Sequence, residues 1–114
     1  MNVEALVGEE LRSVSFVEDF LELRFGAALV TLYAWPHVLL TEFSVAYGEP
    51  EYRNAVCAQI GEEVAAASLE ETNALTIELA NGVVFGLSLR EEDIDAPVSG
   101  SYSAGGSAED AEEF

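Results

Sequence analysis

The chain contains the same pattern twice, and this internal repeat limits the folds that it can adopt. Gly8-Glu9-Glu10 and Gly61-Glu62-Glu63 each precede segments in which apolar residues alternate with polar ones. The two copies align at an offset of 53 residues, which becomes 54 after the first turn. Strict alternation is typical of strands with one buried face. Two copies are too few for a solenoid, so we expect a duplicated domain with pseudo-two-fold symmetry.

Each copy is predicted to form a meander of three antiparallel strands. The Asn81-Gly82 pair is a strong signal for a tight turn, because both residues tolerate positive φ. In the third strands, the alignment matches Thr31 with Phe85. A fourth strand is expected over 38–47, with Leu39, Thr41, Phe43, Val45 and Tyr47 on one face. The meander strands are expected at 10–17, 20–26 and 28–35, and again at 63–70, 74–80 and 83–89.

One main helix is predicted at about 50–60. Pro50 suits the first turn of a helix, where its missing N–H costs nothing, and Gly61 is typical of a helix end. The spacing places Tyr52, Val56, Cys57 (or Ala55) and Ile60 on one side. A shorter helix is expected at 3–7. The predicted fold class is therefore α+β, with antiparallel strands in one curved sheet or two small packed sheets, and the main helix over one face.

The predicted domain covers residues 1–95, with repeat one at 1–48 and repeat two at 49–95. Residues 96–114 are rich in glycine, serine and acidic residues. Such a composition buries little apolar surface against the entropy cost of ordering, so we expect a flexible, disordered acidic tail.

Charge limits the partners that this chain can have. It carries 22 acidic residues against four arginines and no lysine, a net charge of −18. Binding to nucleic acid needs a basic surface, and anionic membranes are disfavoured for the same reason. No apolar run approaches the roughly 20 residues of a membrane helix. With no basic segment of a secretory signal at its start, we expect a bacterial cytoplasmic protein whose partner is basic.

Residues that could carry chemistry are few. His37 is the single histidine and Cys57 the single cysteine, and nothing in their local sequence brings them together. The acidic stretch 91–95 offers oxygen ligands but lacks the glycine and the distal glutamate of a calcium loop. We therefore expect a protein that is not an enzyme and has no cofactor and no metal site.

Aromatic residues gather between positions 33 and 52. They can form the core where the first meander meets the helix, which is the favoured interpretation. They can also be exposed anchors, because tryptophan and tyrosine are enriched in interface hot spots. The candidate interface residues are Tyr33, Trp35, His37, Tyr47 and Tyr52.

Most of residues 6–95 resembles a family of small, stand-alone bacterial α+β proteins that have no assigned biochemical function. The likeness is carried by Asp19-Phe20-Leu21 at a strand start, Tyr33-Ala34-Trp35-Pro36 at a turn, Tyr52-Arg53-Asn54-Ala55-Val56-Cys57 in the helix, and Ile60-Gly61. It brings no catalytic or ligand-binding residues with it. Size, acidity and fold class also resemble those of immunity proteins of bacterial toxin systems.

Three hypotheses for function follow. The first is a non-enzymatic, acidic protein-binding module of the immunity or inhibitor type, which masks a basic partner. The second is a homodimer that pairs through open sheet edges. The third is a small-ligand-binding protein or enzyme that uses carboxylates in a pocket between the two halves.

Overall fold

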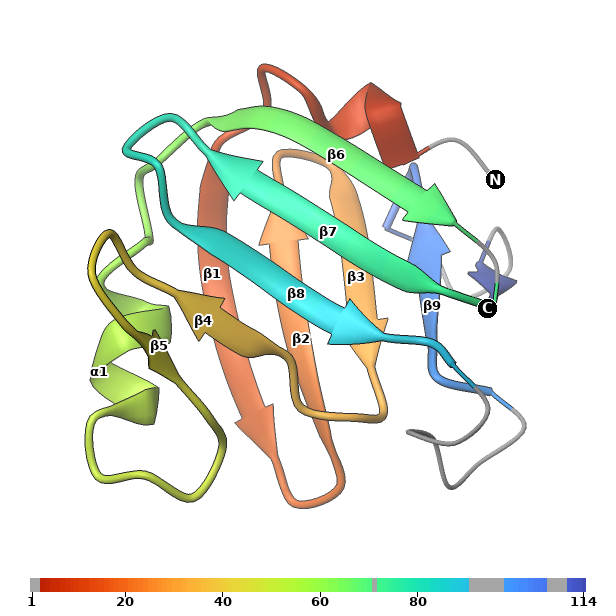
Figure 1. The fold of residues 1–114 in the computed structure, drawn as a ribbon. Helices are drawn as coiled ribbons and strands as arrows, with labels where there is room; N and C mark the ends of the chain where they lie inside the picture. Colours follow the sequence, from red (N-terminus) through yellow and green to blue (C-terminus); the bar gives the residue numbers. More distant parts are fainter. Residues whose placement is uncertain (1–2, 71, 91–97, 107–110) are drawn as a thin grey trace.

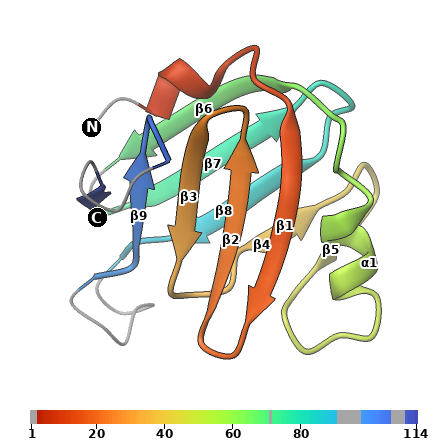
Figure 2. The ribbon, with the colours of Figure 1, turned by 180° about the vertical axis from the view of Figure 1, so that it is seen from behind.

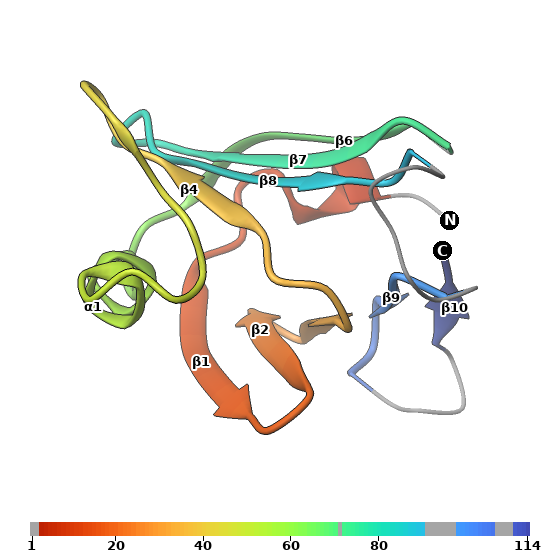
Figure 3. The same ribbon diagram turned by 60° about the horizontal axis from the view of Figure 1, so that its bottom comes forward.

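In the central strands, buried apolar side chains alternate with outward-facing ones, so each sheet has one apolar face. The apolar faces of the two sheets pack against each other. The computed structural model describes residues 3–70, 72–90, 98–106 and 111–114. Within these residues, ten strands form two five-stranded antiparallel sheets, which lie as two layers with a short helix at one open end (Figures 1 and 3). The expectation of antiparallel sheets is confirmed, and the sheets are two packed layers rather than one curved sheet.

The first sheet has the strand order β1-β2-β3-β9-β10, and the second has the order β5-β4-β8-β7-β6. The first sheet contains β1 (Leu11–Val17), β2 (Phe20–Phe25), β3 (Ala28–Leu32), β9 (Gly100–Ser103) and β10 (Glu112–Glu113). The second contains β4 (His37–Leu39), β5 (Ser44–Val45), β6 (Val64–Glu70), β7 (Ala74–Leu79) and β8 (Val84–Ser88). The six meander strands therefore lie where alternation predicted them, with ends that differ by up to three residues.

The fourth strand of each half pairs with the other half. β4 follows β3 along the chain but pairs with β8, and β9 follows β8 but pairs with β3. Each sheet is thus completed by a strand from the opposite half of the sequence. Buried apolar side chains from both sheets form one continuous core, and the radius of gyration of 12.9 Å is close to the ~13 Å of a single domain of this length.

A second link joins the two Gly-Glu-Glu segments. Residues 8–11 run antiparallel to 61–64 and share four backbone hydrogen bonds of 2.8–2.9 Å, with a bridge between Glu10 and Glu63. The glycine that opens each segment has a φ of +89° or +99°, a conformation that side-chain-bearing residues adopt rarely. The shared motif therefore builds a direct backbone connection between β1 and β6.

The strand predicted at 38–47 is wrong, because the chain reverses within it. The backbone N–H of Leu40 donates to the Phe43 carbonyl at 2.8 Å, and β4 and β5 pair as a hairpin. Val38 and Val45 face the core, whereas Leu39 and Phe43 are exposed. The turn at 41–42 interrupts the alternation of inward and outward side chains. An alternation counted through the turn therefore places Leu39 on the buried face, where Val38 lies instead.

The helix α1 (Tyr52–Cys57) has only six residues, and the 3-10 helix η1 (Val3–Leu6) has four. The buried side of the α1 segment holds Tyr52, Val56 and Gln59, while the predicted Cys57 and Ile60 are exposed. The side-chain amide of Gln59 is hydrogen-bonded through both its nitrogen and its oxygen, so its buried polar atoms are satisfied. α1 lies at the end of the sandwich and covers no sheet face (Figure 3), so the fold is mostly β.

The two inner hairpins differ by one residue, which corrects the predicted alignment of the third strands. Two residues, 26–27, separate Phe25 from its partner Ala28, whereas three residues, 80–82, separate Leu79 from Val83, whose carbonyl accepts the Leu79 N–H. Phe85 consequently occupies the buried position that Val30 has in the first sheet. The predicted match with Thr31 is wrong, since Thr31 points away from the core.

The expectation of a disordered tail over 96–114 is wrong for the residues that form β9 and β10. Tyr102 is buried between the sheets, and the N–H of Phe114 donates to the Gly100 carbonyl at 3.0 Å. A Cβ on Gly100 would lie 2.5 Å from the Thr31 carbonyl oxygen, so only glycine permits this approach to β3. The composition of this segment predicted disorder because an average over the segment gives little weight to a single aromatic residue, Tyr102. Nor does it show that the edge of β3 is open for pairing.

Replacing Tyr102 tests the packing of β9. Tyr102 is 5 % exposed, and Tyr102→Ala is expected to lower the free energy of unfolding by about 3–5 kcal/mol, as for other buried aromatic residues. The matched control is Tyr33→Ala, because Tyr33 is 46 % exposed; it should cost less than about 1 kcal/mol. Urea unfolding followed by circular dichroism measures both. Equal effects of the two substitutions would contradict the placement of Tyr102 in the core.

Candidate functional site

Four aromatic side chains meet beside α1 and form what is here called the aromatic cluster. The rings of Trp35 and Tyr47 are stacked, with centroids 4.1 Å apart and planes 7° apart. Phe16 lies 6.1 Å from Trp35 in a nearly parallel arrangement. The Tyr52 ring presents its edge to both Phe16 and Tyr47. Stacked and edge-on contacts of this kind add to the energy of apolar burial, so the cluster fixes α1 against the sandwich.

Tyr52 is the buried member of the aromatic cluster. It is 2 % exposed, and its hydroxyl donates a hydrogen bond of 2.6 Å to the Pro36 carbonyl. Burial raises the pKa of the Tyr52 phenol above its usual value, and the neighbouring Tyr47 adds to the shift. Tyr52 therefore belongs to the core and presents no surface to a partner.

The accessible side of the aromatic cluster is Tyr47, which is 48 % exposed. It lines a small groove of about 320 Å³ together with Glu49, Pro50 and Arg53. The Arg53 guanidinium also lies 5.4 Å from the centre of the Phe16 ring, in cation–π geometry. The groove thus already contains a positive charge of the protein itself.

The other two candidate interface residues lie apart from the aromatic cluster. Tyr33 contacts Phe20 edge-to-face at 6.0 Å. His37 is exposed on β4, opposite Gly86 of β8. Within the described part of the chain, neither the His37 side chain nor the exposed Cys57 thiol has a hydrogen-bond partner. The five candidates are therefore divided among three places, and only Trp35, Tyr47 and Tyr52 come together.

A larger groove, of about 580 Å³, crosses the outer face of the first sheet. This face, formed by β9, β3, β2 and β1, is turned toward the viewer in Figure 2. We call it the outer groove. It lies on the surface of one sheet and not between the two halves, where the third hypothesis placed a pocket. Its principal lining residues are Phe20, Glu22, Thr31, Tyr33, Ser101 and Glu113.

Four of these residues form one row across the sheet. Glu22 pairs with Thr31, Thr31 with Ser101, and Ser101 with Glu113, so two hydroxyls stand between two carboxylates. Three strand spacings separate the ends of the row, about 14 Å between Cα atoms. Neither carboxylate makes a hydrogen bond or an ion pair within the described part of the chain. The outer groove therefore offers two carboxylate acceptors, and the nearest described positive charge is Arg24 at its rim, where a Cβ on the lining residue Gly106 would lie 2.8 Å from a guanidinium nitrogen.

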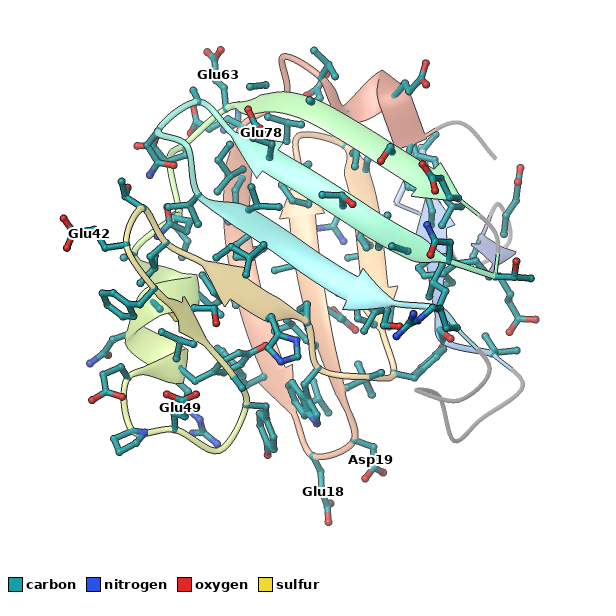
Figure 4. All side chains as sticks on the ribbon, in the orientation of Figure 1. Glu18, Asp19, Glu42, Glu49, Glu63 and Glu78 are labelled. Carbon is teal, nitrogen blue, oxygen red and sulfur yellow. The ribbon has the colours of Figure 1, made fainter. Side chains whose placement is uncertain are left out.

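Other acidic residues lie at several places on the surface. Glu18 and Asp19 project from the turn between β1 and β2, and Glu42, Glu49, Glu63 and Glu78 project outward from other turns and strands (Figure 4). Among the described residues, no three side chains of His, Cys, Asp or Glu are grouped so that they could hold a metal ion. The acidic stretch 91–95 lies outside the described residues.

Sequence reasoning identified Tyr33 but missed the rest of the outer groove. Phe20 and Glu22 could have been found, because they alternate with buried leucines and so must face outward. Ser101 and Glu113 could not, because they lie in the segment expected to be disordered. No local signal indicates that β9 pairs with β3.

The buried phenol of Tyr52 predicts a loss of stability at high pH. Because its pKa in the fold is raised above the ordinary 10, its contribution is complete below pH 10 and is lost as the pH rises further. Tyr102 acts in the same direction, because burial, Glu112 and Glu9 raise its pKa. Tyr52→Phe should cost about 1–2 kcal/mol at pH 7 and should reduce the decline between pH 9 and pH 11.

Urea unfolding at a series of pH values measures this effect, with Tyr33→Phe as the exposed control. The control should follow the wild type at every pH. Parallel curves for wild type and Tyr52→Phe would show that the Tyr52 phenol does not contribute to the alkaline decline.

No protein-family model, curated protein or solved structure matches this chain. The resemblance to a family of small bacterial proteins, and the looser one to immunity proteins, therefore stay predictions. Among the described residues, no helix is long and apolar enough to cross a membrane.

Proposed function

We propose that this protein is a non-enzymatic, acidic binding module that masks a basic protein partner, in the manner of an immunity or inhibitor protein. The observation that carries the proposal is the charge of residues 1–90, where fourteen acidic residues against four arginines leave −10. This charge belongs to residues that precede the predicted tail at 96–114. It is spread over the turns and strands of both sheets (Figure 4).

A field of this kind favours association with a basic surface. Negative charge distributed around a compact body raises the rate of encounter with a cationic partner and disfavours acidic ones. Interactions between exposed charges are screened by salt over a Debye length of about 8–10 Å. The proposed complex should accordingly weaken as ionic strength increases. We place it in the bacterial cytoplasm, as the sequence predicts.

The arrangement of the outer groove supports binding better than catalysis. Paired carboxylates that act as acid and base on one bond lie within reach of that bond, and in glycosidases the two carboxyl groups are about 5–9.5 Å apart. Glu22 and Glu113 stand at opposite ends of a four-strand row. They are better placed to accept hydrogen bonds from one ligand at two points.

Self-association has less support, because two of the four sheet edges offer little backbone to pair with. The terminal strands β5 and β10 contain two residues each, and short edge strands are poor templates for another chain. The other two edge strands, β1 and β6, have seven residues each, and they are joined to each other only at their first residues, through segments 8–11 and 61–64. We therefore propose a monomeric module with a different protein as its partner.

We infer also that the fold is a tandem duplication with pseudo-two-fold symmetry. Three observations support this inference: the two sheets have equivalent strand orders, each first strand shifts register at the same point (between Leu11 and Ser13, and between Val64 and Ala66), and the bridge between the halves pairs Glu10 with its counterpart Glu63. The second copy then extends beyond residue 95 and includes β9 and β10.

The proposal is tested by capture followed by measurement on a purified pair. The tagged protein is incubated with lysate and washed at about 50 mM and about 500 mM salt, which span the range from weak to strong screening. We expect a basic protein that is retained at low salt and released at high salt. With both proteins purified, the dissociation constant should rise with salt concentration. An acidic or neutral partner with salt-insensitive affinity, or no partner at all, would contradict the proposal.

A further inference from the structure

We propose that the outer groove binds an arginine side chain of the basic partner. This inference rests on the proposed function and adds the place and the chemistry of recognition. It follows from three features of the outer groove: two carboxylates without a partner among the described residues, an aromatic pair, and an excess of acid over base, since Arg24 beside Gly106 is the one described basic residue at its rim.

The row of polar side chains matches the donors of a guanidinium. Arginine presents five N–H donors in one plane and no acceptor, so its ideal site contains acceptors on more than one side. Glu22 and Glu113 flank the row, and their long side chains can lean over the hydroxyls of Thr31 and Ser101 that lie between them. A guanidinium above the hydroxyls can therefore donate charge-assisted hydrogen bonds to carboxylates at two of its edges.

The aromatic pair provides the apolar part of the site. Phe20 lies two residues before Glu22 on β2, and Tyr33 lies two residues after Thr31, so both rings flank the same end of the row. Methylene groups of an arginine can pack there, and the guanidinium plane can stack on the exposed Tyr33 ring. The protein already uses this kind of contact, since its own Arg53 lies 5.4 Å from the Phe16 ring centre.

Three other grooves among the described residues lack this combination. One of them, of about 240 Å³ and lined by Ala66, Ala67, Ser68, Thr76 and Glu78, has a single carboxylate and no aromatic residue. The groove on the outer face of the second sheet, about 350 Å³, has Thr76 where the first sheet has Glu22 and Gly86 where it has Thr31, and Arg90 lines it. The groove beside the aromatic cluster is lined by Arg53. The outer groove also has an arginine at its rim, Arg24 beside Gly106, but it is the one of these grooves whose described lining holds two carboxylates. It is therefore the place that a positive side chain should prefer.

The test uses a blocked pentapeptide, Gly-Arg-Gly-Arg-Gly, and its counterpart with neutral citrulline at both arginine positions. Binding to the full chain is measured by isothermal titration calorimetry at low salt. The groove variant is Glu22→Gln with Glu113→Gln. The matched control is Glu42→Gln with Glu78→Gln, which changes the net charge equally at two exposed positions of the other sheet (Figure 4).

We expect the arginine peptide to bind at least 10-fold more tightly than the citrulline peptide. The groove variant should weaken binding about 5-fold or more, because each exposed ion pair contributes a factor of about 1.5–5. Tyr33→Leu should weaken it about 2–5-fold through the lost cation–π contact. The control variant should change it less than about 2-fold, as expected for screened distant charges.

Three results would overturn the inference. Equal weakening by the groove and control variants would show attraction by net charge alone. Equal binding of the citrulline peptide would show that the cation is not recognised. Binding of spermidine without binding of the arginine peptide would identify a free polyamine, not a protein side chain, as the ligand.

The failure of this inference is distinguishable from the failure of the proposed function. If a basic partner binds with the expected salt dependence and the groove variant retains it with unchanged affinity, the partner docks elsewhere and the inference alone is wrong. If the groove variant loses the peptide but no basic partner exists, the proposed function is wrong, and the inference that the outer groove binds arginine is retained.

Discussion

The exchange of fourth strands between the two sheets is the constraint on which this structure depends. β4 belongs to the first half of the chain but pairs with β8 of the second half. β9 belongs to the second half but pairs with β3 of the first half. Neither sheet can then be completed by a continuous half of the chain. Since the two layers also share one core, we expect the protein to unfold as a single cooperative unit.

The same exchange builds the outer groove. β2 and β3 supply Phe20, Glu22, Thr31 and Tyr33, but β9 and β10 extend the sheet beyond β3 and bring Ser101 and Glu113 into the row. In the second sheet the equivalent extension is made by β4 and β5, where the outward residues are His37 and Leu39. The architecture is thus alike on the two faces, while the chemistry that we propose for binding is confined to one.

The sequence predicted those parts of the fold that local patterns determine. Alternation with a period of two located six strands, because each strand buries one face whatever its neighbour is. It could not reveal that β9 pairs with β3, since that contact depends on an edge some 70 residues away along the chain. Nor could it show that Tyr52 is buried and Tyr47 accessible, because accessibility depends on how α1 sits against Trp35.

Nuclear magnetic resonance tests the central claim most directly, that a basic partner places an arginine in the outer groove. ¹⁵N-labelled protein is titrated with the arginine pentapeptide, and the backbone amide shifts are mapped onto the two sheets. The account predicts changes concentrated at Phe20, Glu22, Thr31 and Ser101, across β2, β3 and β9. Changes centred on Tyr47 and Arg53 or on the outer face of β6–β8, or no changes at all, would contradict it.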